Sequence, residues 1–112
     1  MKIIKVKDTN TANTPHNVDV RKLLSHEHGS FVHIELRPGE ELKMHVTPVD
    51  AVFYILEGNG IVQIGKEIEN VEKDQLIFSP AKIPHKLKND SAQNFKFLVV
   101  KTPAPTEETK IL

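Results

Sequence analysis

The sequence predicts a small all-β domain, and three observations support that prediction. The chain has 112 residues, which is enough for one modest hydrophobic core but not for two. Its apolar residues alternate with polar ones at every second position far more often than they recur at the helical period of about 3.6 residues. Glycine, proline, asparagine and aspartate interrupt these runs at short intervals, as they do in antiparallel folds with many strands.

The alternating runs define the expected strands. We expect strands at residues 3–7, 30–37, 42–47, 51–57, 60–65, 67–71, 75–79, 84–88 and 94–101. The turn after the strand 51–57 contains Gly58 and Gly60, which tolerate the positive φ angles that tight hairpins need. So many short strands in a chain of this length indicate a sandwich or a barrel.

We expect a single domain with flanking segments of different character. Residues 1–29 are expected to form an N-terminal strand and a linker, with one helical turn at 19–24. Residues 30–101 are expected to form the barrel. Residues 102–112 contain two prolines and few apolar side chains, which predicts an extended or mobile C-terminal arm.

One expected strand differs from the others because it is apolar at every position from 51 to 56. Such a run implies burial on both faces. One face fills the interior of the domain, and a second copy of the chain would cover the other. The sequence therefore predicts a homodimer.

Charge and composition exclude several classes of partner. The 15 Lys and Arg balance 15 Asp and Glu, and the pI is near 7.0, so no long-range field favours nucleic acids or anionic membranes. The chain has no cysteine, which excludes disulfides, thiolate metal sites and cysteine nucleophiles and is typical of a cytoplasmic protein. The first residues alternate Lys with Ile and Val and do not form the apolar block of a signal peptide, and no segment reaches transmembrane length.

Two of the six histidines stand out by their context. His45 and His85 each lie on an expected strand shortly after a turn that contains proline. In contrast, His16, His26 and His28 lie in polar, turn-like stretches, and His33 is expected on the more solvated face of its strand.

The residues around His45 and His85 resemble the two motifs of the cupin superfamily, G(X)5HXH(X)3,4E(X)6G and G(X)5PXG(X)2H(X)3N. The first is matched by Gly39, His45 and Gly58, and the second by Pro80, His85 and Asn89. This resemblance covers roughly residues 30–100 and implies a jelly-roll barrel, the double-stranded β-helix. It also implies a site at the mouth of the barrel, where such proteins often hold one divalent metal on three His and one Glu.

The chain departs from the motifs at the metal ligands. Thr47 occupies the second histidine position and Ala51 the glutamate position, while Asp74 and Lys82 occupy the glycine positions of the second motif. Asp50 is one residue out of phase with Ala51 and is expected on the opposite face of its strand. Two imidazoles alone hold a metal weakly. We therefore do not expect a tightly held cofactor, and a divalent Zn, Fe, Mn or Ni ion on His45 and His85 is the alternative.

The phase of the strands suggests a different use for the site. If His45 points inward, Lys43 and Thr47 do so too, and Phe53 lines the same wall. With His85, these residues suit a carboxylate, a phosphate or sugar hydroxyls. Two alternatives remain open: Lys43 extends from the rim into solvent, and the histidines are a hydrogen-bonded core pair.

The sequence thus favours a small-molecule binding protein with a polar or anionic ligand at Lys43, His45, Thr47, Phe53 and His85. The alternative is an enzyme, either a metal-dependent isomerase or dioxygenase on His45 and His85, or one that uses a histidine as general base. A general base needs a matched acid. Tyr54 is the available phenol, but its phase against Phe53 turns it away from the interior.

Overall fold

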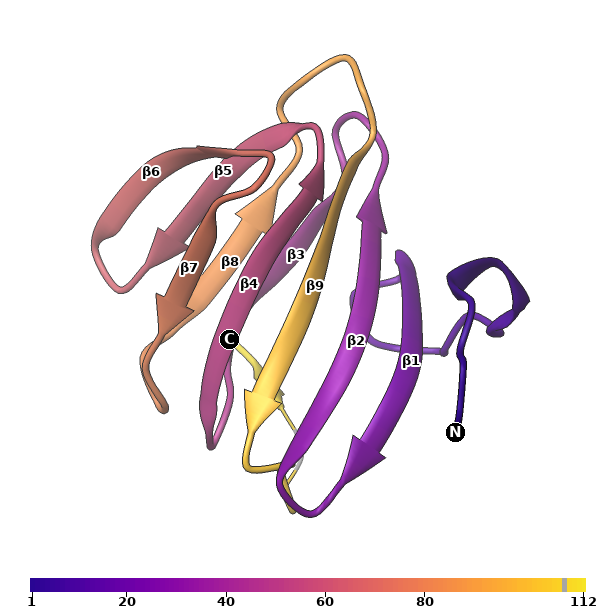
Figure 1. Cartoon of the computed structure of the whole chain (residues 1–112). Coiled ribbons are helices and arrows are strands. Elements are labelled where there is room, and N and C mark those ends of the chain that lie inside the picture. The colour runs from indigo at the N-terminus through magenta and orange to yellow at the C-terminus, as the bar shows by residue number, and fades with distance from the viewer. Residues whose placement is uncertain (108) are drawn as a thin grey trace.

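The computed structural model of the chain describes residues 1–107 and 109–112 and shows two antiparallel sheets packed face to face (Figure 1). The β9 sheet has the strand order β1-β2-β9-β4-β7, and the β3 sheet has the order β10-β3-β8-β5-β6. The strands are β1 (Asp19–His26), β2 (Gly29–Leu36), β3 (Glu41–Val46), β4 (Asp50–Glu57), β5 (Asn59–Ile64), β6 (Glu67–Glu72), β7 (Leu76–Ser79), β8 (His85–Lys88), β9 (Phe95–Thr102) and β10 (Lys110–Ile111). This arrangement confirms the all-β jelly roll expected from the sequence.

The core lies between the two sheets and follows the alternation of the strands. In β9, Phe95, Phe97 and Val99 are buried, and their neighbours in sequence are half-buried on the outer face. In β4, Ala51, Phe53 and Ile55 point inward in the same way. These residues form one hydrophobic cluster with Val20, Ile34, Leu36, Leu42, Val62, Val71 and Leu87.

The prediction of a strand at residues 3–7 is wrong. The structure has a short 3-10 helix there, η1 (Val6–Asp8), without a buried residue. The guanidinium of Arg21 donates hydrogen bonds to the carbonyl oxygens of Val6 and Thr9, so a side chain, not a neighbouring strand, holds this segment. No helix in the described part of the chain has the length and apolar character needed to cross a membrane.

The prediction of a helical turn at residues 19–24 is also wrong, because these residues belong to strand β1. β1 pairs antiparallel with β2, and its register shifts between Lys22 and Leu24. This bulge interrupts the alternation and gives Val20, Leu23 and Leu24 a spacing that imitates a helix.

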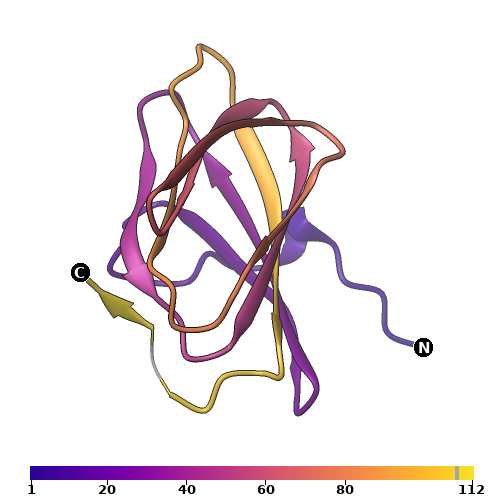
Figure 2. The ribbon, with the colours of Figure 1, turned by 90° about the vertical axis from the view of Figure 1, so that its left-hand side faces the viewer.

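The end of the C-terminal arm is extended, as one of the two expectations had it, and is held by strand pairing. Strand β10 pairs with the end of β3, where Ile111 lies opposite His45, and the N–H of Leu112 donates to the carbonyl of Met44. Strands β1 and β10 thus extend the two sheets beyond residues 30–101. The chain ends lie on opposite sides of the sandwich, the N-terminus near the outer face of the β9 sheet and the C-terminus beside β3 (Figure 2).

Candidate functional site

The two histidines meet where β3 ends and β8 begins, and β8 begins at the lower end of the barrel in Figure 1. His45 lies near the end of β3 and His85 begins β8, and the two residues are direct partners in the antiparallel pairing of these strands. Their Nε2 atoms are 2.9 Å apart, and both side chains are buried, with exposed fractions of 5% and 1%. The expected convergence of the two imidazoles inside one barrel is therefore found.

A chain of hydrogen bonds fixes the tautomer of each ring. The Nδ1 of His45 lies 2.6 Å from the carbonyl oxygen of Lys43, which only accepts, so this nitrogen carries the proton. The Nε2 of neutral His45 must then accept, and the Nε2 of His85 donates to it. The Nδ1 of neutral His85 in turn accepts from the hydroxyl of Ser79 at 2.7 Å. The hydrogen bonds therefore all run in one direction, from Ser79 to the backbone of β3.

Both rings are held neutral. Burial, with smaller contributions from His45, Lys101 and His16, lowers the pKa of His85 to about 3. Burial also lowers the pKa of His45 to about 4, although the hydrogen bond to the Lys43 carbonyl opposes the shift. At neutral pH the pair therefore works as a hydrogen-bonding unit without charge.

Two of the other expected site residues lie beside the pair. Thr47 is buried, and its hydroxyl donates to the carbonyl of Val49. The ring of Phe53 stands edge-on to His85, with ring centroids 5.1 Å apart. Tyr54 points the other way, as expected, and its hydroxyl donates to Asp74.

Lys43 does not share the interior with His45, which corrects the expectation from strand phase. The register of β3 shifts between Leu42 and His45, so Leu42 and His45 are both buried while Lys43 is exposed. The main chain of Lys43 nevertheless supports the site. Its carbonyl accepts from His45, and its N–H donates to the Nδ1 of His16.

Sequence reasoning missed three residues that the fold brings to this end of the barrel. His16, from the loop before β1, lies edge-on to His45 with ring centroids 4.8 Å apart, and no sequence signal pointed to it. Ser79 is the last residue of β7 and is fully buried. Lys101 continues the inward alternation of Phe97 and Val99 by one step, so the strand pattern could have identified it.

The charges that act on the three imidazoles have one sign. Lys101 lowers the pKa of His45 and His85, after the larger effect of burial. For His16, burial also lowers the pKa most, followed by Lys43 and Lys101. In the described part of the chain, every charged group that shifts these three pKa values is basic.

His33 lies outside this site. It is buried on the outer face of the β9 sheet rather than solvated, beside a cavity of about 320 Å³ that is lined by Val6, Lys7, Asp19, Arg21, His33, Glu35 and Lys96. Within the described residues its Nδ1 has no hydrogen-bond partner.

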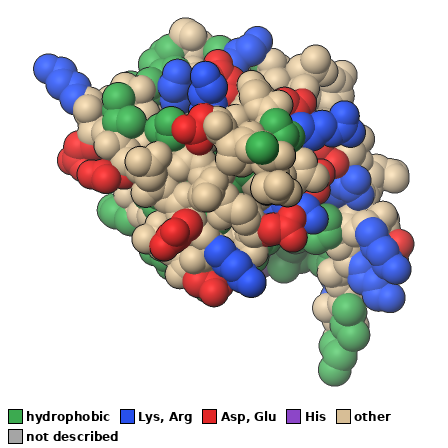
Figure 3. All heavy atoms as spheres, turned by 90° about the horizontal axis from the view of Figure 1, so that it is seen from above, with side chains coloured by type: hydrophobic (Ala, Val, Ile, Leu, Met, Phe, Trp, Pro, Cys, Tyr) green, Lys and Arg blue, Asp and Glu red, His purple; other side chains and the backbone are tan. Residues whose placement is uncertain are grey.

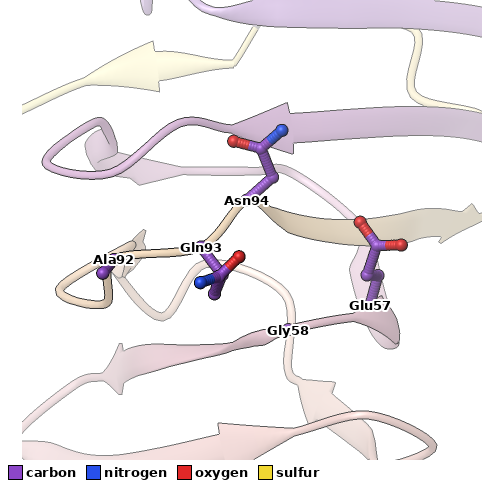
Figure 4. Close-up of a pocket in the computed structure, with 5 residues that line it drawn as sticks. All are labelled: Glu57, Gly58, Ala92, Gln93 and Asn94. Atoms are coloured by element: carbon purple, nitrogen blue, oxygen red, sulfur yellow. The ribbon is translucent and has the colours of Figure 1, made fainter.

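A larger surface depression, of about 490 Å³, lies at the opposite end of the barrel. Glu57, Gly58, Ala92, Gln93 and Asn94 line it, where β4 ends and β9 begins (Figure 4). In the view onto this end, acidic, basic and apolar side chains are mixed and no histidine is visible (Figure 3). The histidine-rich end is thus chemically distinct from this one.

The fold and the paired histidines match a known family. Residues 32–101 match the family model of the cupin domain. The chain belongs to the cupin family. The backbone agrees with the family's motifs even where the residues differ, because Asp74 and Lys82, at the two glycine positions of the second motif, have positive φ angles of 67° and 68°.

Individual relatives are similar over different parts of the chain. An uncharacterized protein of Methanocaldococcus jannaschii is 36% identical over 72 residues, which cover 63% of this chain and 57% of that protein. The chain spans about half the length of the curated relatives it matches. The crystal structure of the protein TT1209 from Thermus thermophilus is 32% identical, with a TM-score of 0.80, and the match covers 94% of this chain and 100% of that one.

Solved structures with lower identity support the fold alone. The polyketide cyclase RemF from Streptomyces resistomycificus is 22% identical, with a TM-score of 0.83, over 100% of this chain and 85% of that one. A protein of Klebsiella pneumoniae described as having a double-stranded β-helix domain is 16% identical, with a TM-score of 0.84, over 99% of this chain and 96% of that one.

Cupin family members often bind a metal ion, but the side chains present here do not fit one well. No group of three or more His, Cys, Asp or Glu among the described residues is placed to hold a metal. Asp50 faces away from the imidazoles, as expected, and accepts a hydrogen bond from the N–H of Ala81. Two imidazoles under the influence of a lysine fall short of the three protein ligands typical of catalytic zinc.

Proposed function

We propose that this protein binds a small polar or anionic molecule at the barrel mouth around His45 and His85. The observation that supports this function is the one-sided electrostatics of the site. Its imidazoles are neutral, and the charged groups that act on them, so far as the structure describes them, are basic. Such a site attracts an anion or a hydrogen-bonding polar group and repels a dication.

The hydrogen bonds of the two histidines indicate which donor and acceptor groups the ligand must offer. The Nε2 of His45 is an acceptor and the Nε2 of His85 is a donor, and they now satisfy each other. A ligand with a hydroxyl beside a carbonyl or carboxylate oxygen offers both partners at once. It replaces one internal hydrogen bond by two, so no buried nitrogen is left unpaired.

The second candidate is a metal-dependent enzyme of the isomerase or dioxygenase type. The spacing of the imidazoles favours it: two nitrogens bound to one ion at about 2.1 Å and at a right angle lie about 3 Å apart, and the Nε2 atoms here are 2.9 Å apart. The hydrogen bond from His45 Nδ1–H to a backbone carbonyl also orients the ring as in metal sites. We rank the enzyme second because Ala51 stands where the motif has the glutamate ligand.

The test separates the two candidates by metal content and by ligand response. Protein purified without a histidine tag is analysed for bound metals, together with His45→Ala and, as a control, the exposed His28→Ala. We expect less than stoichiometric metal in all three. Stoichiometric metal that is lost only in His45→Ala establishes the enzyme candidate instead.

Ligand binding is then measured by thermal shift and by NMR with a library of small polar and anionic compounds. We expect hits that shift the ring signals of His45 and His85 in the parent and fail to bind His45→Ala, while His28→Ala responds like the parent. If every hit binds His45→Ala as tightly as the parent, the proposed site is refuted.

A further inference from the structure

We propose that Lys101 is the anion-binding residue of this site and that the group it binds is a carboxylate of the small ligand. The inference rests on the proposed function and makes it specific. It assigns the positive charge of the site to Lys101, not to a bound metal and not to Lys43.

The position of Lys101 follows from the register of β9. Lys101 pairs with Ser30 of β2 and with Ala51 of β4, and Ala51 also pairs with Ser79, whose hydroxyl binds His85. The β-carbon of Lys101 therefore lies on the inner face of the β9 sheet, the same face as Ala51 and Ser79. Ala51 is small, which leaves room beside it for a long side chain.

The amine of Lys101 reaches across the barrel mouth. Its Nζ donates to the hydroxyl of Thr109 at 3.2 Å, just before strand β10. β10 lies against β3, with Ile111 opposite His45. The side chain thus extends from the β9 sheet to the edge of the β3 sheet and passes close enough to the imidazoles to affect the pKa of all three.

The surroundings of the amine favour a carboxylate over a phosphate. One half-buried ammonium balances one negative charge, and burial already lowers the pKa of Lys101, with Lys22 adding to the effect. A dianion would leave a charge unbalanced at a site where the imidazoles are neutral. A carboxylate accepts from Nζ with one oxygen and from His85 Nε2–H with the other, in charge-assisted and neutral hydrogen bonds, while a hydroxyl next to the carboxylate donates to the Nε2 of His45.

Thr109 occupies the position that the ligand needs. Its hydroxyl is a weaker acceptor for an ammonium than a carboxylate oxygen is. Ligand binding therefore exchanges the Thr109 contact for the carboxylate, and removal of the threonine hydroxyl removes this competition.

The experiment uses pairs of hydroxylated ligands that differ in charge and little in shape: glycolate with glycolamide, and lactate with lactamide. Dissociation constants are measured by NMR titration at constant low ionic strength, with inorganic phosphate as a further probe. In the parent we expect each carboxylate to bind at least about tenfold more tightly than its amide and more tightly than phosphate.

The variants are Lys101→Met, Lys101→Arg and Thr109→Val, with Lys73→Met as the matched control. Lys73 is an exposed lysine in the turn after β6, at the far end of the barrel from the histidines. We expect Lys101→Met to remove the preference for carboxylates, Lys101→Arg to retain part of it, and Thr109→Val to strengthen carboxylate binding about fivefold. Lys73→Met should behave like the parent.

The outcomes distinguish this inference from the proposed function. If glycolate and glycolamide bind equally well and shift the signals of His45 and His85, the binding site stands but the role of Lys101 is refuted. An unchanged carboxylate preference in folded Lys101→Met refutes it as well. Tighter binding of phosphate than of every carboxylate overturns the ligand class.

Discussion

At the scale of single residues, Ser79 has the most specific task, because it is the donor for a buried imidazole nitrogen. Both Ser79 and His85 are almost completely removed from solvent. Ser79→Ala leaves the Nδ1 of His85 without its donor, so we expect a loss of about 1–3 kcal/mol in the free energy of unfolding. Urea unfolding measures the loss, and Ser25→Ala, at an exposed position of β1, is the control. A loss no larger than that of the control contradicts the assigned hydrogen-bond chain.

The burial of His33 leads to a prediction about how the stability of the protein depends on pH. Burial lowers its pKa, against the attraction of Asp19 and Glu35 and with the help of Lys96 and Arg21. The unfolded chain therefore binds a proton at this residue more readily than the folded protein does, so the stabilising contribution is complete above the usual histidine pKa of about 6.5 and is lost as the pH falls below it.

We therefore expect His33→Leu to flatten the decline in thermal stability between about pH 6.5 and 5. The half-buried His16 and the buried His45 and His85 contribute with the same sign, so part of the decline remains. The control is His28→Leu, which removes an exposed histidine. Parallel pH profiles for the parent and His33→Leu would exclude the effect.

The sequence could predict the residues of the site that a motif or an uninterrupted strand specifies. The motif spacing was enough to identify His45, His85 and Asn89. Asn89 is a buried turn residue whose side-chain amide donates to the carbonyls of Leu36 and Gln93. The prediction that Lys43 points inward failed because the order of polar and apolar residues does not reveal the register shift in β3. His16 could not be predicted, because only the tertiary fold brings its loop to the site.

At the scale of strands, Gly60 in β5 is a position without room for a side chain. A β-carbon built there would lie 2.6 Å from the Phe95 ring and 2.7 Å from the carbonyl oxygen of Lys88. We expect Gly60→Ala to destabilise the protein by about 1–3 kcal/mol, because the buried ring has to move. At Gly29 the nearest atoms are 3.5 Å away, so Gly29→Ala is expected to stay within about 0.5 kcal/mol of the parent. Equal stabilities in urea unfolding would show that β5 adjusts freely.

Most strands could be predicted because their alternation is regular, and the errors have physical causes. β1 was misassigned where its bulge breaks the alternation. β10 has only two residues and is ordered by pairing with β3, not by its own sequence. The segment before β1 alternates like a strand, but its carbonyls are bound by Arg21.

At the scale of the whole molecule, the part of the outer face of the β9 sheet formed by β4 and β7 is apolar, and we propose that a second copy of the chain binds there. Phe78 and Leu76 of β7 are 55% and 61% exposed, and they lie opposite Val52 and Tyr54 of β4. Contiguous apolar surface of this kind marks an interaction site.

We expect light scattering to give twice the 12.6 kDa mass of one chain. Phe78→Lys should shift the protein toward the monomer, because it places a charge in the proposed contact, while the exposed Ile68→Lys in β6 of the other sheet should not. A monomer mass for the parent at high concentration rules the dimer out.

The placement of β10 has a practical consequence for anyone who labels or immobilises this protein. The N–H of Leu112 donates a hydrogen bond to the carbonyl of Met44, one residue from His45, so a fluorophore, affinity tag or fusion partner attached after Leu112 lies beside the proposed binding site. The N-terminus lies on the opposite side of the sandwich (Figure 2). Attachment there keeps the proposed site clear for binding measurements.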